Sequence, residues 1–352
     1  MINAVPTVRK MASYALADLG DPSAVSLAQN ESAFPPSPKA LAAGRTALQQ
    51  AALYPDPDWR ALRGAIAGVH PVAEEEILCG AGSMELVGAV IRAYAGPGDK
   101  VLGTQFGYLF VATATQQAGA QYVRAPEVNL QVDVDGILSM VDPATRIVFV
   151  CNPGNPTGTR IPNADIIRLR MYMHQDILLV VDQAYAEFDD QDHDPIFDLV
   201  RLGNTIITRT FSKAYGLAGA RVGWGVFPPD VAAELRKLMN PNNISGAAQA
   251  MATAAMLDQS YMMKVVQDTT TIRHDFISRL SKAEIHTPPS FTNFVLLQFA
   301  NAQTAATADS ALRAAGVIMR PMGGYGLSDC LRATVGPPPA MDRAASVLEA
   351  LI

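Results

Sequence analysis

The sequence predicts an α/β protein with a large domain in which a mostly parallel sheet is flanked by helices. Short apolar, β-branched runs in the middle of the chain alternate with longer segments of helical periodicity, which is typical of βα units. The expected strands are 100–102, 146–150, 177–181 and 205–207, and clear helical patterns cover 84–95 and 165–175. At 352 residues the chain is longer than one core usually supports, so about two domains are expected.

The two ends of the chain read differently from the middle. Residues 1–40 are irregular and proline-rich, whereas an Ala/Met-rich helical pattern runs from about 245 to 258. Apolar runs follow at 294–297, 317–319 and 331–335, separated by helical or turn segments. We therefore expect a large domain at 41–240 and a smaller α+β domain built from both termini, 1–40 and 241–352.

Composition excludes several classes of function. A net charge of -6 and the lack of a Lys/Arg cluster argue against nucleic-acid binding. No run of 18 apolar residues is present, so no membrane span is expected. Cys79, Cys151 and Cys330 are scattered without metal-ligand or disulfide-framework spacing, which predicts no metal and favours the cytoplasm. The expected partners are small molecules.

The stretch from Arg209 to Arg221 carries one lysine, Lys213, just after a predicted strand. A lysine held away from water favours its neutral, nucleophilic form and can form a Schiff base. Thr210, Ser212 and Arg221 would suit a nearby phosphate dianion. Together they suggest pyridoxal 5'-phosphate as cofactor. The alternative is a surface loop with a solvated lysine.

A second group of candidates follows the apolar run that ends at Val181. Asp182 would be mostly buried and needs a partner, such as a protonated pyridine nitrogen. Tyr185 could bond the phenolic oxygen of the same ring. The alternative for Asp182 is a helix cap.

Two further turns are placed to contact such a cofactor. Asn155, in a double Asn-Pro turn, has an amide that could bond a ring oxygen, although turn chemistry alone could explain it. Gly82, Ser83 and Met84 open a predicted helix, whose free N–H groups suit phosphate. Tyr108 could stack on a flat ring or simply pack in the core.

Two arginines interrupt strand-like runs near the C-terminus, Arg320 and Arg332. A guanidinium in an apolar strand needs an anion, and a substrate carboxylate or phosphate would accept its paired N–H groups. An internal salt bridge is the alternative.

These motifs occur in the order and spacing of a known family: N-P-x-N-P-T-G from Asn152, D-x-A-Y from Asp182, S-K-A from Ser212 and L-A-G-x-R from Leu217. From about Met11 to the C-terminus, the chain resembles the fold-type I pyridoxal-phosphate-dependent aminotransferases, and most of all the histidinol-phosphate aminotransferase group. It departs from the family pattern at Gln183, where an acidic residue is usual, and at Met84, where aspartate is common.

The resemblance implies specific roles. Lys213 would carry the cofactor and shuttle a proton, Asp182 would pair with the pyridinium, Asn155 and Tyr185 would bond the ring oxygen, and Tyr108 would stack on the ring. The phosphate would be held by Gly82, Ser83, Met84, Thr210, Ser212 and Arg221, with Tyr54 of the partner subunit. Substrate anions would meet Arg332, Arg320 and Tyr14 of the partner subunit, and Asn30 lies in the substrate-binding segment. The resemblance therefore also implies a homodimer.

The expected reaction is ping-pong transfer of an amino group between an amino donor, such as glutamate, and an oxo acceptor. Two alternatives stay open: an aromatic amino-acid aminotransferase, and a pyridoxal-phosphate lyase such as a phosphothreonine-type decarboxylase. The bond held perpendicular to the cofactor ring is the one that breaks, so the placement of the substrate decides between transferase and lyase.

Overall fold

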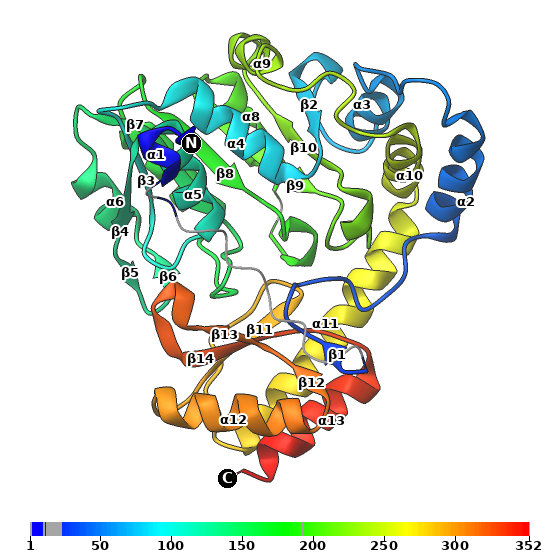
Figure 1. Ribbon diagram of the computed structural model, residues 1–352, viewed down its shortest axis with the longest axis vertical. Coiled ribbons are helices and arrows are strands. Elements are labelled where there is room, and N and C mark those ends of the chain that lie inside the picture. Colours follow the sequence, from blue (N-terminus) through cyan, green and yellow to red (C-terminus); the bar gives the residue numbers. More distant parts are fainter. Residues whose placement is uncertain (1, 10, 12–22, 192, 352) are drawn as a thin grey trace.

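The structure, a computed structural model, describes residues 2–9, 11, 23–191 and 193–351 (Figure 1). Within these residues the main sheet has seven strands in the order β2-β10-β9-β8-β7-β3-β4. Their bounds are β2 Ile77–Gly80, β3 Lys100–Thr104, β4 Gln121–Ala125, β7 Thr145–Cys151, β8 Leu178–Asp182, β9 Thr205–Thr210 and β10 Gly223–Val226. Among the described strands of this sheet, β10 is the one that runs opposite to the others, because it is antiparallel to both β2 and β9. The mostly parallel α/β sheet predicted from the sequence is thus confirmed.

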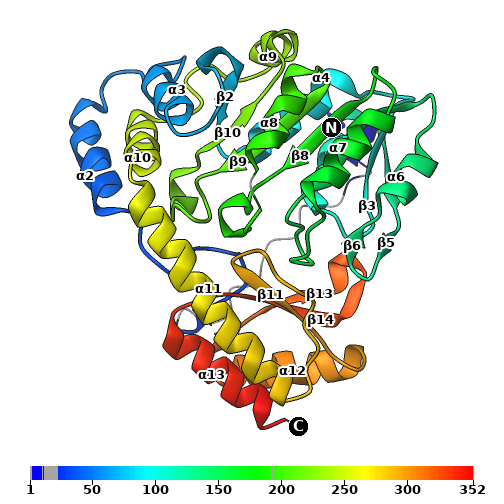
Figure 2. The same ribbon diagram turned by 180° about the vertical axis from the view of Figure 1, so that it is seen from behind.

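Helices cover both faces of this sheet. On the face seen in Figure 1 lie α4 (Ser83–Tyr94) and α5 (Leu109–Ala118), and on the opposite face, seen in Figure 2, lie α7 (Asn163–Tyr172) and α8 (Asp194–Arg201), with α6 (Val134–Met140) beside α7. The apolar run of α4 from Leu86 to Ile91 is buried against the strands, because strands buried on both faces need apolar cover on each side.

The remaining elements complete the large part, which is built around the main sheet. They are the helices α1 (Pro6–Arg9), α2 (Pro38–Ala47), α3 (Arg60–Ala67), α9 (Pro229–Arg236) and α10 (Gly246–Met256), the hairpin of β5 (Glu127–Val128) and β6 (Gln131–Val132), and the 3₁₀ turns η1 (Leu48–Gln50), η2 (Glu74–Glu76), η3 (Ala186–Phe188) and η4 (Ala218–Ala220).

The small part lies below the sheet in Figure 1 and takes residues from both ends of the chain. Its antiparallel sheet has the order β11-β14-β13 (Phe294–Gln298, Leu327–Thr334, Arg320–Met322), with η5 (Gly323–Tyr325) between β13 and β14, and β1 (Val25–Ser26) pairs in parallel with β12 (Val317–Ile318). The helices α11 (Gln259–Lys282), α12 (Ala302–Ala314) and α13 (Pro338–Glu349) pack against it. Leu27 joins this second core from the N-terminal side.

The larger core continues beyond residue 240. Four side chains of α10, those of Ala248, Ala252, Ala255 and Met256, are buried in the same cluster as the main sheet, and α10 packs against α2 and α3. The long helix α11 then runs from the large part into the small one (Figures 1 and 2). The domain boundary at 240/241 stays a prediction. The helix α10 follows this boundary in the sequence but packs with the large part.

The register of the parallel strands brings three strand ends to one edge of the main sheet. Cys151 at the end of β7 lies opposite Asp182 at the end of β8, and Asp182 lies opposite Thr208 of β9. Loops that follow these strands thus start side by side. No helix in the described residues is long and apolar enough to cross a membrane.

The packing of Leu27 predicts a stability effect. Leu27 is 1% exposed in the small core, so Leu27→Ala should lower the free energy of unfolding by about 2–5 kcal/mol. Leu202→Ala is the matched control, because Leu202 is 71% exposed and its loss should cost under about 0.5 kcal/mol. Urea denaturation followed by circular dichroism measures both. Equal midpoints for the two variants would contradict the assignment of Leu27 to the small core.

Candidate active site

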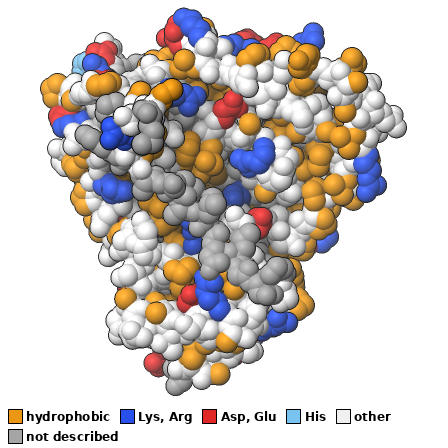
Figure 3. Space-filling view, viewed as in Figure 1, with side chains coloured by type: hydrophobic (Ala, Val, Ile, Leu, Met, Phe, Trp, Pro, Cys, Tyr) orange, Lys and Arg blue, Asp and Glu red, His pale blue; other side chains and the backbone are white. Residues whose placement is uncertain are grey.

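A cavity of about 430 Å³ lies between the large and the small part. Its walls come from strand ends and loops of the large part together with β13, η5 and β14 of the small part. Thirteen residues predicted as site residues line it: Asn30, Ser83, Met84, Tyr108, Asn155, Asp182, Tyr185, Thr210, Ser212, Lys213, Arg221, Arg320 and Arg332. On the face shown in Figure 3, lysine and arginine side chains gather near the centre, where the two parts meet.

Lys213 sits on a tight turn directly after β9. Buried Phe211 anchors this turn, because its N–H donates to Val222 O at 3.0 Å and its carbonyl accepts from Leu217 N at 2.9 Å. The Lys213 amine donates to Asn30 O at 2.8 Å and lies 5.8 Å from the centre of the Tyr185 ring. Burial, together with the positive charge of Arg332, lowers the pKa of Lys213 to about 7. This environment differs from that of a solvated surface lysine.

Asp182 is the last residue of β8 and is 4% exposed. Burial raises its pKa to about 6, against a hydrogen bond of 2.9 Å from Thr208 Oγ1 that favours the ionised form. The next 3₁₀ turn begins at Ala186 with Tyr185 in the N-cap position, so Asp182 does not cap it. A cationic ligand group beside the carboxylate would offset the cost of its burial.

Tyr185 and Asn155 present polar atoms to the cavity from the loops after β8 and β7. The Tyr185 hydroxyl accepts a hydrogen bond of 2.9 Å from Asn30 Nδ2, and its ring packs edge-on against Phe294. Burial raises the pKa of Tyr185 well above its usual range, so its hydroxyl keeps its proton. Asn155 Oδ1 accepts from Arg332 Nη1 at 2.6 Å, which leaves the amide nitrogen of Asn155 as a donor.

Hydrogen-bond donors for an anion gather at the start of α4. The N–H groups of Ser83 and Met84 lie in the first helical turn, where no intrahelical acceptor is in reach. Ser212 Oγ accepts from Thr210 Oγ1 at 2.9 Å and from Arg221 Nη1 at 3.4 Å. At Gly82, with φ of 84°, a Cβ would lie 2.3 Å from Arg221 Nη2. Glycine therefore lets the guanidinium approach this turn, and the group of donors fits a phosphate dianion.

Arg320 and Arg332 face each other across the β13–β14 pair. Arg332 is 4% exposed, donates to Ala28 O at 2.9 Å and to Asn155 Oδ1, and lies over the Phe294 ring. Among the described lining residues four carry cationic groups, Lys213, Arg221, Arg320 and Arg332, and two carry carboxylates, Glu31 and Asp182. This excess of positive charge favours anionic ligands.

Three predicted site residues lie elsewhere or are not described. Gly82 lies just behind the cavity wall, under Arg221. Tyr54 is 89% exposed and lines a different, open groove between η1, α10 and the loop at 241–245. Tyr14 lies outside the described residues.

Other residues line the cavity although the sequence interpretation gave them no role. Gln29, Glu31, Cys151 and Tyr325 are the polar ones. Cys151 directly follows the predicted strand 146–150 and precedes the Asn-Pro turn, and this position was the available signal. Neither Tyr325 nor Glu31 lies in a sequence pattern that indicates chemistry.

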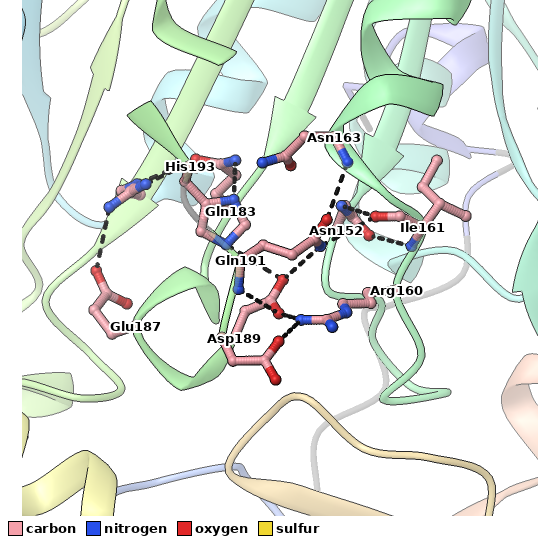
Figure 4. Close-up of polar contacts among 11 residues, drawn as sticks. Asn152, Arg160, Ile161, Asn163, Gln183, Glu187, Asp189, Gln191 and His193 are labelled. Carbon is pink, nitrogen blue, oxygen red and sulfur yellow. Dashed lines mark hydrogen bonds and ion pairs between the residues drawn. The ribbon is translucent and has the colours of Figure 1, made fainter. Parts of the chain in front are cut away.

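A chain of polar contacts joins Gln183, His193 and Asp189 in the loop after β8 (Figure 4). Gln183 directly follows β8 and is fully buried. Its Oε1 accepts from Arg209 Nε and Nη2 at 3.2 and 3.1 Å, and its Nε2 lies 3.1 Å from His193 Nδ1. His193 Nε2 is 3.3 Å from Asp189, which also pairs with Arg160. These contacts tie the loops after β7 and β8 together.

Known proteins resemble the chain over nearly its full length. The family model described as aminotransferase class I and II matches residues 22–348. Two curated relatives are named histidinol-phosphate aminotransferase. The one from Paramagnetospirillum magneticum is 43% identical over 314 residues, covering 88% of this chain and 86% of that protein. The one from Jannaschia sp. is 40% identical over 327 residues, covering 93% and 91%.

A solved structure agrees with these matches. The crystal structure of histidinol-phosphate aminotransferase from Sinorhizobium meliloti in complex with pyridoxal-5'-phosphate superposes with a TM-score of 0.93 at 28% identity, covering 100% of this chain and 98% of that chain.

The environment of Lys213 predicts its titration in the cofactor-free protein. Acetylation of the Lys213 amine, followed by peptide mass spectrometry, should rise with pH and reach half its maximal rate near pH 7, because only the neutral amine reacts. A lysine model peptide should do so near about 10.4. Arg332→Gln should move the Lys213 midpoint upward by removing a nearby cation, whereas Arg236→Gln, on α9 and away from the cavity, should not. A Lys213 midpoint equal to that of the peptide would contradict this account.

Proposed function

The chain belongs to the class I and II aminotransferases, and we propose that it is a pyridoxal-phosphate-dependent transaminase acting on a substrate of the histidinol-phosphate type. One observation supports this most directly: a lysine with a pKa of about 7, a buried carboxylate and a phosphate-sized group of donors line one cavity. The named relatives and the cationic lining point to the same kind of substrate.

The residues present fit this cofactor. The start of α4, with Thr210, Ser212 and Arg221, would hold the phosphate, and Asp182 would face the pyridine nitrogen. Asn155 and Tyr185 would bond the ring oxygen, and Tyr108 would lie against the ring. When bound, pyridoxal phosphate supplies an aldehyde that condenses with amines and a ring that draws electrons from the substrate Cα.

Lys213 and Asp182 would have separate roles in the reaction. The neutral amine of Lys213 would be the nucleophile that holds the cofactor. When free and neutral, Lys213 Nζ would also be the base that takes the proton from the substrate Cα. Asp182 would hold a proton on the pyridine nitrogen, because an ionised carboxylate in a buried place favours a cation beside it. Burial between the two parts limits access of water to these groups.

Substrate binding is assigned to the arginines of the small part. Arg332 and Arg320 lie side by side on neighbouring strands and both line the cavity. A guanidinium binds phosphate and carboxylate in the same forked geometry. The same pair would therefore accept the phosphate of histidinol phosphate in one half-reaction and a carboxylate of glutamate in the other.

We infer that the active unit is a homodimer and that it works in the cytoplasm. Exposed apolar side chains, Leu48, Leu53, Tyr54 and Leu257, border the groove between η1 and α10. A second copy covering this groove would remove them from water and could carry Tyr54 to the neighbouring phosphate site. The three cysteines are buried and unpaired, as is usual in a reducing compartment.

A screen of single half-reactions tests the substrate. The enzyme loaded with cofactor is mixed with histidinol phosphate, glutamate, phenylalanine, tyrosine or phosphothreonine, and the change in cofactor absorbance is followed. Histidinol phosphate and glutamate should react fastest, and Arg320→Gln should raise KM for histidinol phosphate about tenfold or more through the lost ionic hydrogen bond. Reaction with phosphate-free aromatic donors alone, or release of carbon dioxide, would reject this substrate assignment.

A subunit-mixing experiment tests the homodimer. Lys213→Ala should be inactive, and Tyr54→Ala should bind the cofactor more weakly because one phosphate ligand is lost. A hybrid dimer, purified through two different affinity tags, has one site with both native residues. Its activity at low cofactor concentration should exceed that of either parent dimer. Activity no greater than the average of the parents would show that Tyr54 does not act across a subunit interface.

A further inference from the structure

Asn30 occupies an unusual place for a polar residue next to a substrate cavity. It is 1% exposed, and its backbone has a φ of 56°, in the left-handed region that asparagine tolerates better than most residues. It lies between β14 of the small part and Tyr185 of the large part. The sequence interpretation placed it among substrate-binding residues.

Each polar atom of Asn30 already has a partner in the protein. Its N–H donates to Thr334 Oγ1 at 2.8 Å, and its Oδ1 accepts from the same hydroxyl at 3.4 Å. Its carbonyl accepts from Lys213 Nζ at 2.8 Å and Asn293 Nδ2 at 3.1 Å. Its Nδ2 donates to the Tyr185 hydroxyl at 2.9 Å. The side chain is therefore engaged with the cofactor-facing tyrosine rather than directed at a substrate.

The direction of these bonds decides what Tyr185 can do. A hydroxyl has one hydrogen, and Thr334 Oγ1, which accepts the Asn30 N–H, gives its hydrogen to Asn30 Oδ1. This contact favours the amide orientation in which Nδ2 faces Tyr185. Since Tyr185 O then accepts from Asn30, its own hydrogen is left for the cavity that it lines.

We propose that Asn30 is a positioning residue that makes Tyr185 a hydrogen-bond donor toward the ring oxygen of the cofactor. This inference rests on the proposed function, because it needs a cofactor oxygen at that place. A hydroxyl that accepts a hydrogen bond is also a stronger donor, since successive hydrogen bonds polarise one another. Asn30 thus both directs and strengthens the bond that Tyr185 gives.

The opposite side of the ring oxygen has a parallel arrangement. Arg332 donates to Asn155 Oδ1, so the amide nitrogen of Asn155 is directed to the cavity as a second donor. Arg332 and Thr334 are two residues apart on β14 and therefore point to the same side of that strand. One face of the small part thus fixes both hydrogen-bond donors of the large part.

Two hydrogen-bond donors at the ring oxygen stabilise its negative charge. They thereby lower the pKa of the nitrogen that joins the cofactor to Lys213. The titration of that nitrogen changes the cofactor's absorption spectrum, which gives a readout separate from turnover. A residue that only supports the fold would leave the midpoint of this titration unchanged.

The test uses Asn30→Gly in the cofactor-loaded enzyme, because glycine keeps the positive φ and removes only the amide. The midpoint should rise by about 0.5–1 pH unit, the size expected for weakening one hydrogen bond. Tyr185→Phe should raise it at least as much, and adding Asn30→Gly to Tyr185→Phe should change nothing further. Cofactor affinity, measured by equilibrium dialysis, should fall in the same order.

Asn30→Asp gives a second, independent variant. An ionised carboxylate only accepts hydrogen bonds, so it takes the Tyr185 hydrogen away from the cofactor. Asn30→Asp should raise the titration midpoint more than Asn30→Gly does. The rise caused by Asn30→Asp should also be larger with Tyr185 present than in the Tyr185→Phe background. Gln29→Glu is the matched control, because it adds the same charge to the cavity wall from the neighbouring residue.

Three results would overturn the inference. The first is a titration midpoint in Asn30→Gly that equals the wild-type midpoint, while Tyr185→Phe shifts it. The second is a midpoint shift by Asn30→Gly that is equally large in the wild-type and in the Tyr185→Phe background. The third is an equal rise for Asn30→Asp and Gln29→Glu, which would reduce the effect to charge. If the wild-type chain binds the cofactor at Lys213, these results reject only the role of Asn30. A wild-type chain that forms no linkage at Lys213 rejects the proposed function and this inference together.

Discussion

The site depends on the backbone carbonyls of residues 28–30. Ala28 O accepts from Arg332, and Asn30 O accepts from Lys213 and from Asn293. Carbonyl oxygens orient an ammonium group without offering a full negative charge, so they hold the lysine in place while burial lowers its pKa. A carboxylate in the same position would do the opposite and keep the lysine protonated. A short N-terminal segment thus positions the nucleophile and also joins the small part to the large one.

The positive charge around the cavity explains how the site favours its ligands. Placing Arg221, Arg320, Arg332 and Lys213 around one cavity costs free energy through mutual repulsion and loss of water. Part of this cost appears as the lowered pKa of Lys213. An anion that binds there offsets it, and any ligand that binds only the folded chain also stabilises the fold. Attraction for an anion and the lowered pKa of Lys213 therefore have one electrostatic origin.

The sequence allowed the main sheet and most of the cavity lining to be predicted, because both depend on local signals. Asp182, Asn155 and Lys213 each follow an apolar run, and the edge of a parallel sheet brings such residues together. The contact between Asn30 and Tyr185 could not be predicted, since it joins positions 155 residues apart through a left-handed backbone. The polar contacts that join Arg209, Gln183 and His193 could not be predicted either, because sequence periodicity does not indicate which buried polar groups contact each other. The packing of α10 against the large part could not be predicted, because an Ala-rich helix fits either core.

Strand β14 orients polar groups on two sides of the cavity. Arg332 donates to Asn155 Oδ1, and Thr334 contacts both the N–H and the Oδ1 of Asn30, so two side chains of one strand fix the orientation of two amides of the site. On the proposed function, an anionic substrate at Arg332 would compete with Asn155 for the same guanidinium. The contact of Asn30 with Tyr185 lies apart from that guanidinium and is buried, since Asn30 is 1% exposed. The orientation of Asn155 would therefore respond to the substrate, whereas that of Tyr185 would not.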